Sequence, residues 1–138
     1  AFHVVEHLRD PLSVLIELSS LIYKDGEIII EVPNSEDALL TLYNNQDFQN
    51  FTYWSQHLFL FNESTIRALI VKGKFKLNWI QHVQRYPLVN HLHWLSNGKP
   101  AGEKKWLFMD DSELNKLYEA KLAEQGLTDT IILSIGLN

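Results

Sequence analysis

The chain has no cysteine, and this absence excludes disulfide bridges, thiolate metal sites and cysteine nucleophiles. A chain without disulfides suits a reducing compartment, so the cytoplasm is the expected location. Long hydrophobic runs are also missing: none approaches the roughly 20 residues that a membrane span requires. The sequence opens with no charged-then-apolar signal peptide. We therefore expect a soluble protein with no membrane partner.

Basic residues are few as well, because 12 Lys and Arg stand against 17 Asp and Glu and give a net charge of -5. Nucleic-acid binding draws affinity from clustered Lys and Arg, and here they are scattered, so we expect no nucleic-acid partner. The 138 residues, 46% of them hydrophobic, are enough to form a core. No repeat, low-complexity run or linker marks a boundary, and we expect a single domain over residues 1–138.

Helical periodicity alternates with short apolar runs along the chain. Asp10 and Pro11 are typical of a helix start, and Gly26 of the break that follows a helix. The run EIIIEV over residues 27–32 shows little alternation, which is typical of a strand covered on both faces. Helices are expected at 10–23, 35–43, 62–73, 87–95 and 110–125, strands at 27–32, 75–83 and 130–135, and loops at 44–50 and 98–110. This order favours an α/β fold.

The first chemical motif is HVVEH over residues 3–7, which matches HxxEH, the zinc signature of inverted zinc peptidases. A zinc peptidase needs both histidines on one helical face and a further carboxylate from a later helix. Asp10 and Pro11 begin a new helix only three residues after the motif. The pattern therefore favours the end of a strand running into a turn.

Two later segments also hold candidate residues. Aromatic residues surround His57 in segment 51–62, so this histidine is either part of a core or a general base in an aromatic pocket. His91 and His93 lie two residues apart and would point to different faces of a helix, so they cannot share a metal there. Arg85 and Tyr86 either meet a sugar, a carboxylate or a phosphate, or form an ordinary surface pair.

The opening FHVVEHLRDPLSVLIELSSLIYKDGEIIIEVPN resembles the segment around the fourth and fifth strands of class I S-adenosylmethionine-dependent methyltransferases. The resemblance extends through QHLFLFNESTIRALIVKGKF to about residue 75. It implies a partial Rossmann-like methyltransferase sheet that contains the later strands, with an antiparallel final strand, flanked by helices. In such a sheet the stretch from Phe2 to Asn34 would supply adjacent parallel strands joined by a covering helix.

The same resemblance implies that the family's glycine-rich loop and its ribose-binding acidic residue would lie before Ala1. No GxGxxG-like stretch occurs in the sequence, and the chain starts in apolar sequence without an initiator Met, so we expect the C-terminal part of a larger domain. S-adenosylmethionine should then bind to this chain weakly or not at all. By resemblance, Phe2, His3 and Glu6 lie at the lip of the cofactor pocket.

Two branches of the family bear on the catalytic residue. Small-RNA 2′-O-methyltransferases and ubiquinone-pathway O-methyltransferases hold a divalent ion with ExxEH and a later His; Glu6, His7 and His57 match, but His3 replaces the first Glu. Mg²⁺ prefers oxygen ligands, so we expect no metal. Sugar C-methyltransferases use a YHEH stretch, of which only His57 is present here. His57 is therefore the predicted catalytic base.

Together these observations predict a methyltransferase that acts on a small polar acceptor such as a sugar or a sugar-nucleotide. Tyr53, Trp54, Arg85 and Tyr86 are the predicted acceptor-binding residues. The alternative is a non-catalytic interaction or assembly module with a degenerate methyltransferase fold. An uncovered sheet edge would favour self-association, so a homo-oligomer is expected in that case.

Overall fold

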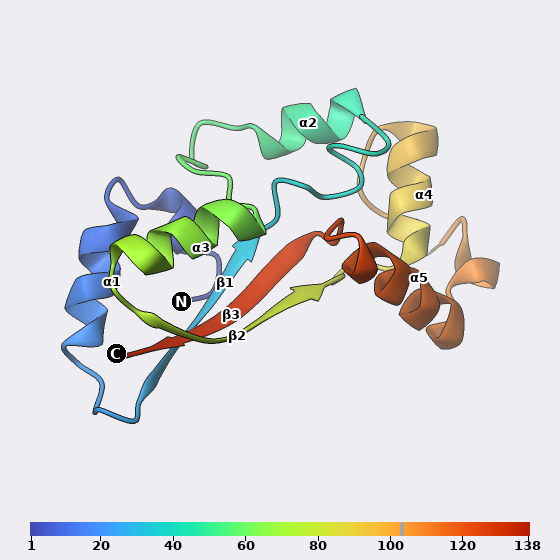
Figure 1. Ribbon diagram of the computed structural model, residues 1–138. Coiled ribbons are helices and arrows are strands. Elements are labelled where there is room, and N and C mark those ends of the chain that lie inside the picture. Colours follow the sequence, from blue (N-terminus) through green and yellow to red (C-terminus); the bar gives the residue numbers. More distant parts are fainter. Residues whose placement is uncertain (103) are drawn as a thin grey trace. The chain divides into compact units, whose positions relative to one another are not determined.

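The computed structural model describes residues 1–102 and 104–138 (Figure 1). They form two compact units, one of Ala1–Asn34, Gln56–Gln81 and Thr130–Asn138, the other of Ser35–Ser55 and His82–Asp129. Each unit is assembled from stretches that alternate along the chain. Neither unit is one continuous piece of sequence. The expectation of a single domain over residues 1–138 stays a prediction.

A three-stranded sheet runs through the first unit. It contains β1 (Glu27–Pro33), β2 (Lys76–Val83) and β3 (Thr130–Gly136) in the order β1-β3-β2. β1 pairs antiparallel with β3, with Ile30 opposite Leu133. The predicted α/β class and the antiparallel final strand are therefore confirmed, and all three strands lie where the sequence predicted them.

The first residues of the chain add a short parallel pairing to the edge of β1. Phe2 forms a parallel bridge with Glu31, and two backbone hydrogen bonds flank it: Glu31 N donates to the Ala1 carbonyl at 2.8 Å and His3 N donates to the Glu31 carbonyl at 2.9 Å. Helix α1 (Pro11–Ser19) connects the two paired segments in sequence. This confirms the predicted pair of parallel segments joined by a helix, although the first segment is only a bridge.

Side-chain caps account for both helices of the first unit. Asp10 accepts a hydrogen bond from Ser13 N at 3.1 Å, and α1 ends at Ser19, earlier than the predicted residue 23. The Ser19 hydroxyl donates to the Ile16 carbonyl three residues back, and such bonds compete with the helical pattern. Helix α3 (Glu63–Lys72) starts with a reciprocal pair of bonds between its cap Asn62 and Thr65.

The core of the first unit lies between the sheet and these two helices. Its buried members are Val5, Leu15, Ile28, Ile30, Val32, Phe61, Ile66, Ile70, Phe75, Ile131, Leu133 and Ile135. Burial alternates along β1, with Ile30 buried and Ile29 exposed, so the prediction of a strand covered on both faces is wrong. The middle strand of the order, β3, is the one that is buried almost throughout.

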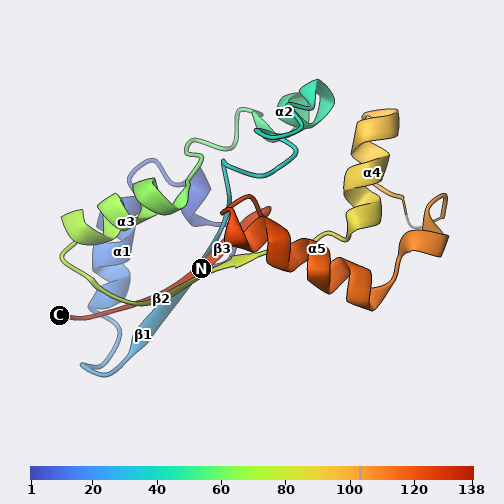
Figure 2. The same ribbon diagram turned by 45° about the vertical axis from the view of Figure 1, so that its right-hand side comes forward.

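The second unit contains α2 (Gln46–Thr52), α4 (Leu88–Asn97), a 3₁₀ turn at Leu107–Met109 and α5 (Ser112–Glu124), which can be followed in Figure 2. The predicted helices at 87–95 and 110–125 are confirmed. The helix predicted at 35–43 is wrong, because that stretch forms turns. Helix α2 instead begins inside the predicted loop 44–50 and extends two residues beyond it. Asp37 accepts a hydrogen bond from Leu39 N at 2.7 Å, which favours a turn over a helix.

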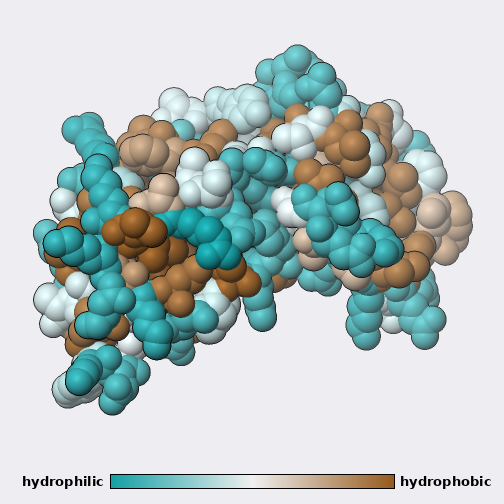
Figure 3. Space-filling model, viewed as in Figure 1, coloured by the Kyte–Doolittle hydropathy of each residue, from teal (hydrophilic) through white to brown (hydrophobic). Residues whose placement is uncertain are grey.

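None of the helices among the described residues is long and apolar enough to span a membrane. On the face drawn in Figure 3, apolar side chains are interrupted by polar ones.

Candidate functional site

Glu6 is the most unusual polar residue of the first unit, because its carboxylate is buried and 1% of the residue is exposed. Neither carboxylate oxygen has a hydrogen-bond partner among the described residues. Two imidazoles lie at ion-pair distance: His3 Nδ1 is 3.3 Å and His7 Nε2 is 3.8 Å from Glu6 Oε1. A buried carboxylate without hydrogen bonds is costly, so its environment requires an explanation.

The backbone of the turn that holds Glu6 also fixes His57. Glu6 lies in the 3₁₀ turn Val5–His7, and its carbonyl accepts hydrogen bonds from Leu58 N at 2.9 Å and Phe59 N at 3.1 Å. These bonds hold the segment that carries His57 against the turn. The ring centroids of His57 and His7 lie 5.0 Å apart. Residues separated by about fifty positions in the sequence therefore meet at one place.

Both neighbouring histidines are oriented by hydrogen bonds. His7 Nδ1 lies 2.7 Å from the Gln56 carbonyl, which can only accept, so Nδ1 carries the proton and Nε2 is the unprotonated nitrogen of the neutral ring. That Nε2 faces Glu6. His3 Nε2 lies 2.9 Å from Glu31 Oε1, and its backbone has a φ of 51°, a left-handed conformation that is uncommon outside glycine. The ring of His3 thus bridges Glu31 and Glu6.

The zinc-peptidase alternative does not fit this geometry. The motif residues do not form an α-helix, because Phe2 pairs with β1 and Val5–His7 is a 3₁₀ turn, so His3 and His7 do not share an α-helical face. The cluster that does form contains Glu6, His7 and His57, whose candidate ligand atoms all lie within 4.8 Å of one another. Two imidazoles and one carboxylate do not fit Mg²⁺, which prefers oxygen ligands in octahedral geometry.

The predicted cofactor-binding residues differ in exposure. Phe2 is 61% exposed, Glu6 is buried and His3 is partly exposed. All three lie at or just after the parallel segment that pairs with β1, the region in which the resemblance placed the cofactor pocket. Their role in binding S-adenosylmethionine stays a prediction.

The predicted acceptor-binding residues belong to the second unit. Tyr53 and Trp54 follow α2 and are exposed. Arg85 and Tyr86 lie between β2 and α4, and the backbone amides of both donate to the Asp129 carboxylate, at 2.9 Å and 3.0 Å for Oδ2. This carboxylate anchors the loop. The structure brings Arg85 and Tyr86 together, as their adjacency in the sequence requires.

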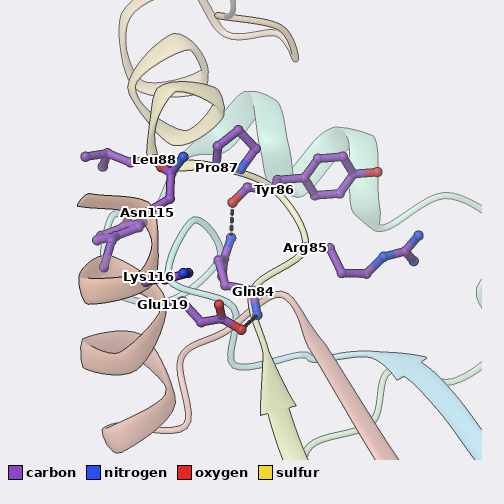
Figure 4. A pocket seen from close by; sticks show the side chains of 9 residues that line it. Gln84, Arg85, Tyr86, Pro87, Leu88, Asn115, Lys116 and Glu119 are labelled. Atoms are coloured by element: carbon purple, nitrogen blue, oxygen red, sulfur yellow. Dashed lines mark hydrogen bonds between the residues drawn. The ribbon is translucent and has the colours of Figure 1, made fainter. Parts of the chain in front are cut away.

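Arg85 and Tyr86 line a hollow of about 190 Å³ between this loop and α5 (Figure 4). Gln84 forms hydrogen bonds with both the loop and α5. Its Nε2 donates to the Tyr86 carbonyl at 3.0 Å, and its backbone N donates to Glu119 Oε1 at 3.3 Å. In Figure 4 the Arg85 side chain points away from Gln84. The remaining lining residues are Pro87, Leu88, Asn115, Lys116 and Tyr118.

A hydrogen-bond chain that contains the buried His91 and Tyr118 of the hollow was not predicted from the sequence, which considered His91 only as a metal ligand. Gln84 Nε2 lies 3.0 Å from His91 Nε2, and an amide NH₂ can only donate, so His91 carries its proton on Nδ1. That Nδ1 donates to the Tyr118 hydroxyl at 2.8 Å, which lies 3.2 Å from the Tyr43 hydroxyl. Burial lowers the pKa of His91 to about 4 and keeps the ring neutral.

Asp37 lies in the same unit and shows the opposite effect. Burial raises its pKa to about 7, partly offset by the hydrogen bond from the Leu39 backbone, while the Asp129 charge raises it further. Burial also raises the pKa of Tyr118. No local sequence signal marks these residues, because the partners Tyr43, His91 and Tyr118 are far apart in the chain.

Comparisons with known proteins find one matching family model and similar solved structures. A family model described as a methyltransferase domain matches residues 1–76. One similar crystal structure is that of a candidate methyltransferase, BH2331 from Bacillus halodurans C-125. The match covers 96% of this chain and 60% of that protein's chain, with 17% identity and a TM-score of 0.50. The YcgJ protein from Bacillus subtilis matches over 99% and 62%, with 15% identity and a TM-score of 0.47. The comparison with curated proteins gives no match. The chain thus spans about three fifths of the length of these structures.

Proposed function

The chain belongs to the methyltransferase-domain family, and from this membership we propose that the protein transfers a methyl group from S-adenosylmethionine to a small polar acceptor. One observation carries the proposal beyond the family. Glu6, His7 and His57 meet just after the parallel segment that pairs with β1. Ligands in α/β sheets bind beyond the carboxyl ends of parallel strands, so this is the expected place of the reaction.

The proposed chemistry needs little from the protein besides orientation and proton transfer. S-adenosylmethionine supplies the reactive methyl group when it is bound, and the transfer is an in-line displacement. His57 is the proposed base that takes the proton of the acceptor, with the backbone bonds at Leu58 and Phe59 fixing its position. Phe2, His3 and Glu6 are the residues of this chain proposed to contact the methionine end of the cofactor.

A hydroxylated acceptor such as a sugar or a sugar-nucleotide fits the predicted acceptor residues. Tyr53 and Trp54 offer exposed aromatic faces on which a ring can pack. Arg85 and Tyr86 belong to a loop whose backbone is already fixed by Asp129, so little backbone ordering is needed on binding. The cytoplasm is the proposed location, because a reducing compartment suits a protein without cysteine.

Calorimetric titration with S-adenosylmethionine tests the proposal. The natural protein, including any residues encoded before Ala1, should bind the cofactor with a micromolar dissociation constant, corresponding to about 8 kcal/mol. The 138-residue chain should bind it far more weakly, because it contains no GxGxxG-like stretch of the kind that holds a nucleotide-type cofactor in this fold. Absence of binding by the natural protein would contradict the proposed activity and favour a non-catalytic module.

A further inference from the structure

We propose that the turn at residues 104–109 binds the surface of a lipid bilayer that carries anionic headgroups, with Leu107 and Phe108 inserted among the lipids. This contact involves none of the residues assigned to methyl transfer. The sequence-based expectation of no membrane partner rested on the absence of a spanning segment and of a signal peptide. Neither absence bears on a contact that reaches only the membrane surface.

Two adjacent apolar side chains are exposed on this turn, which Figure 2 shows in orange before α5. Leu107 is 67% exposed and Phe108 is 79% exposed. Trp106 directly precedes them, and its ring centroid lies 6.3 Å from that of Phe108. Apolar surface residues that are scattered singly need no explanation, but neighbours on one turn form a patch that another surface can cover.

Lysines lie next to this apolar patch. Lys99, Lys104 and Lys105 are all exposed, and the stretch 99–109 has three lysines against one glutamate. The ammonium group of Lys105 lies 5.4 Å from the centre of the Trp106 ring, so a positive charge stands directly beside the patch. The turn therefore combines an apolar centre with a basic border, which is complementary to an anionic lipid surface.

The aspartates that follow the turn form hydrogen bonds with α5. Asp110 Oδ1 accepts from Asn115 Nδ2 at 3.0 Å. Asp111 caps the helix, because its Oδ1 accepts from Glu113 N at 2.9 Å and from Leu114 N at 3.0 Å. Both carboxylates are therefore held at the start of α5 rather than directed to the lysines.

Backbone hydrogen bonds shape the turn before any contact is made. Met109 N donates to the Trp106 carbonyl at 2.8 Å, and Asp110 N donates to the Leu107 carbonyl at 3.1 Å. Such internal pairing suits a segment that enters a lipid surface, because acyl chains offer no hydrogen bonds to backbone groups. Since the backbone is already fixed, little ordering is needed when the side chains leave water.

The small size of the patch favours lipid over a protein partner. A stable protein interface buries about 800 Å² on each side, whereas one aromatic side chain contributes at most about 250 Å². Trp106, Leu107 and Phe108 are too few to supply that area. A bilayer requires less, because apolar side chains enter the acyl boundary while Trp and Lys stay at the level of the headgroups. Each lysine near an anionic surface strengthens binding about fivefold.

Sedimentation with lipid vesicles tests the proposal on the natural protein, including any residues encoded before Ala1. We expect binding to vesicles made from equal parts of phosphatidylcholine and phosphatidylserine. Binding to vesicles of phosphatidylcholine alone should be at least about 10-fold weaker. The double variant Leu107→Ser/Phe108→Ser should bind the mixed vesicles at least about 10-fold more weakly than the wild type.

A matched control is the double variant Leu21→Ser/Tyr23→Ser. These two side chains belong to the first unit and are 78% and 91% exposed, so the control removes a similar amount of exposed apolar surface. Its binding to the mixed vesicles should equal that of the wild type. Circular dichroism verifies that both double variants are folded.

Tryptophan fluorescence gives a second readout that locates the contact. Lipids brominated on their acyl chains should quench the wild type, and Trp106→Phe should lose most of this quenching while it still binds the vesicles. The other three tryptophans of the chain serve as internal controls.

Three results would overturn the proposal. They are equal binding to the two kinds of vesicle, unchanged binding by Leu107→Ser/Phe108→Ser, and quenching that persists in Trp106→Phe. Absence of vesicle binding together with self-association that the double variant abolishes in sedimentation velocity would also overturn it, and would assign the turn to a second copy of the chain. All these outcomes leave the cofactor titration, and with it the proposed function, unaffected.

Discussion

His57 is positioned by its chain neighbours rather than by a helix. His7 Nδ1 donates to the backbone carbonyl of Gln56, and the backbone amide of Leu58 donates to the backbone carbonyl of Glu6. The residues on both sides of His57 are therefore fixed. The sequence could identify His57 as a candidate from its aromatic surroundings. It could also align Glu6 and His7 with a family pattern, but the missing hydrogen bonds of Glu6 depend on packing and left no signal in the sequence.

Asp37 gives a prediction about pH. Its pKa of about 7, raised from 3.8 by burial, means that the folded protein binds a proton more tightly than the unfolded chain does. The contribution of Asp37 to the free energy of unfolding is therefore fully present below pH 3.8 and is lost as the pH rises through 7. Asp37→Asn should therefore be more stable than wild type at pH 7–8, on the order of 3 kcal/mol, and this advantage should shrink as the pH falls to 4.

Urea unfolding at pH 4, 5.5 and 7.5 measures this difference. Asparagine keeps the oxygen that accepts from Leu39 N, so the turn at Asp37 should survive the substitution. A difference between variant and wild type that does not change with pH would show that Asp37 is not buried as a titrating group.

His91 should give the opposite pH dependence. Its pKa is lowered from 6.5 to about 4 by burial, so its contribution is full above pH 6.5 and is lost as the pH falls through 4. His91→Gln should remove this acid sensitivity while it keeps polar atoms near Gln84 and Tyr118. The same urea series measures it: identical acid sensitivity in His91→Gln and wild type would argue against a buried neutral ring.

Among the elements, local signals located most helices and strands because each carries its own start or stop residue. The turn at residues 35–43 is the exception. Its Ser-Glu-Asp opening is typical of a helix start, but Asp37 bonds to Leu39 N two residues on, and Ala38, Leu39 and Leu40 are all buried in succession. Three consecutive buried residues cannot lie on one face of a surface helix. Tertiary burial therefore decides the structure here.

Helix α3 offers a direct test of capping. Asn62 accepts a hydrogen bond from Thr65 N at 2.9 Å, and the Thr65 hydroxyl accepts from Asn62 N at 2.9 Å. Asn62→Ala removes the first of these bonds and should lower the free energy of unfolding by about 1 kcal/mol. Asn97→Ala, at the last residue of α4, is the control and should have little effect in the same thermal or urea unfolding experiment. Equal stability of all three proteins would show that the cap contributes nothing.

For the whole molecule, the family resemblance predicted parallel pairing in the first residues and an antiparallel final strand. The structure shows that this final strand, β3, pairs with β1. The division into two units could not be read from the sequence, because each unit combines stretches from different parts of the chain and no linker composition marks the change. The candidate residues divide in the same way, with Glu6, His7 and His57 in the first unit and the predicted acceptor residues in the second.

The central claim is that this chain carries the proton-handling site of a methyltransferase. The most direct measurement is transfer of a labelled methyl group from S-adenosylmethionine to small hydroxylated acceptors, comparing the natural protein with its His57→Ala variant. We predict transfer by the wild type and a loss of about 10²–10⁴-fold in kcat in the variant, with the affinity for S-adenosylmethionine unchanged. Equal transfer by both proteins would contradict the account.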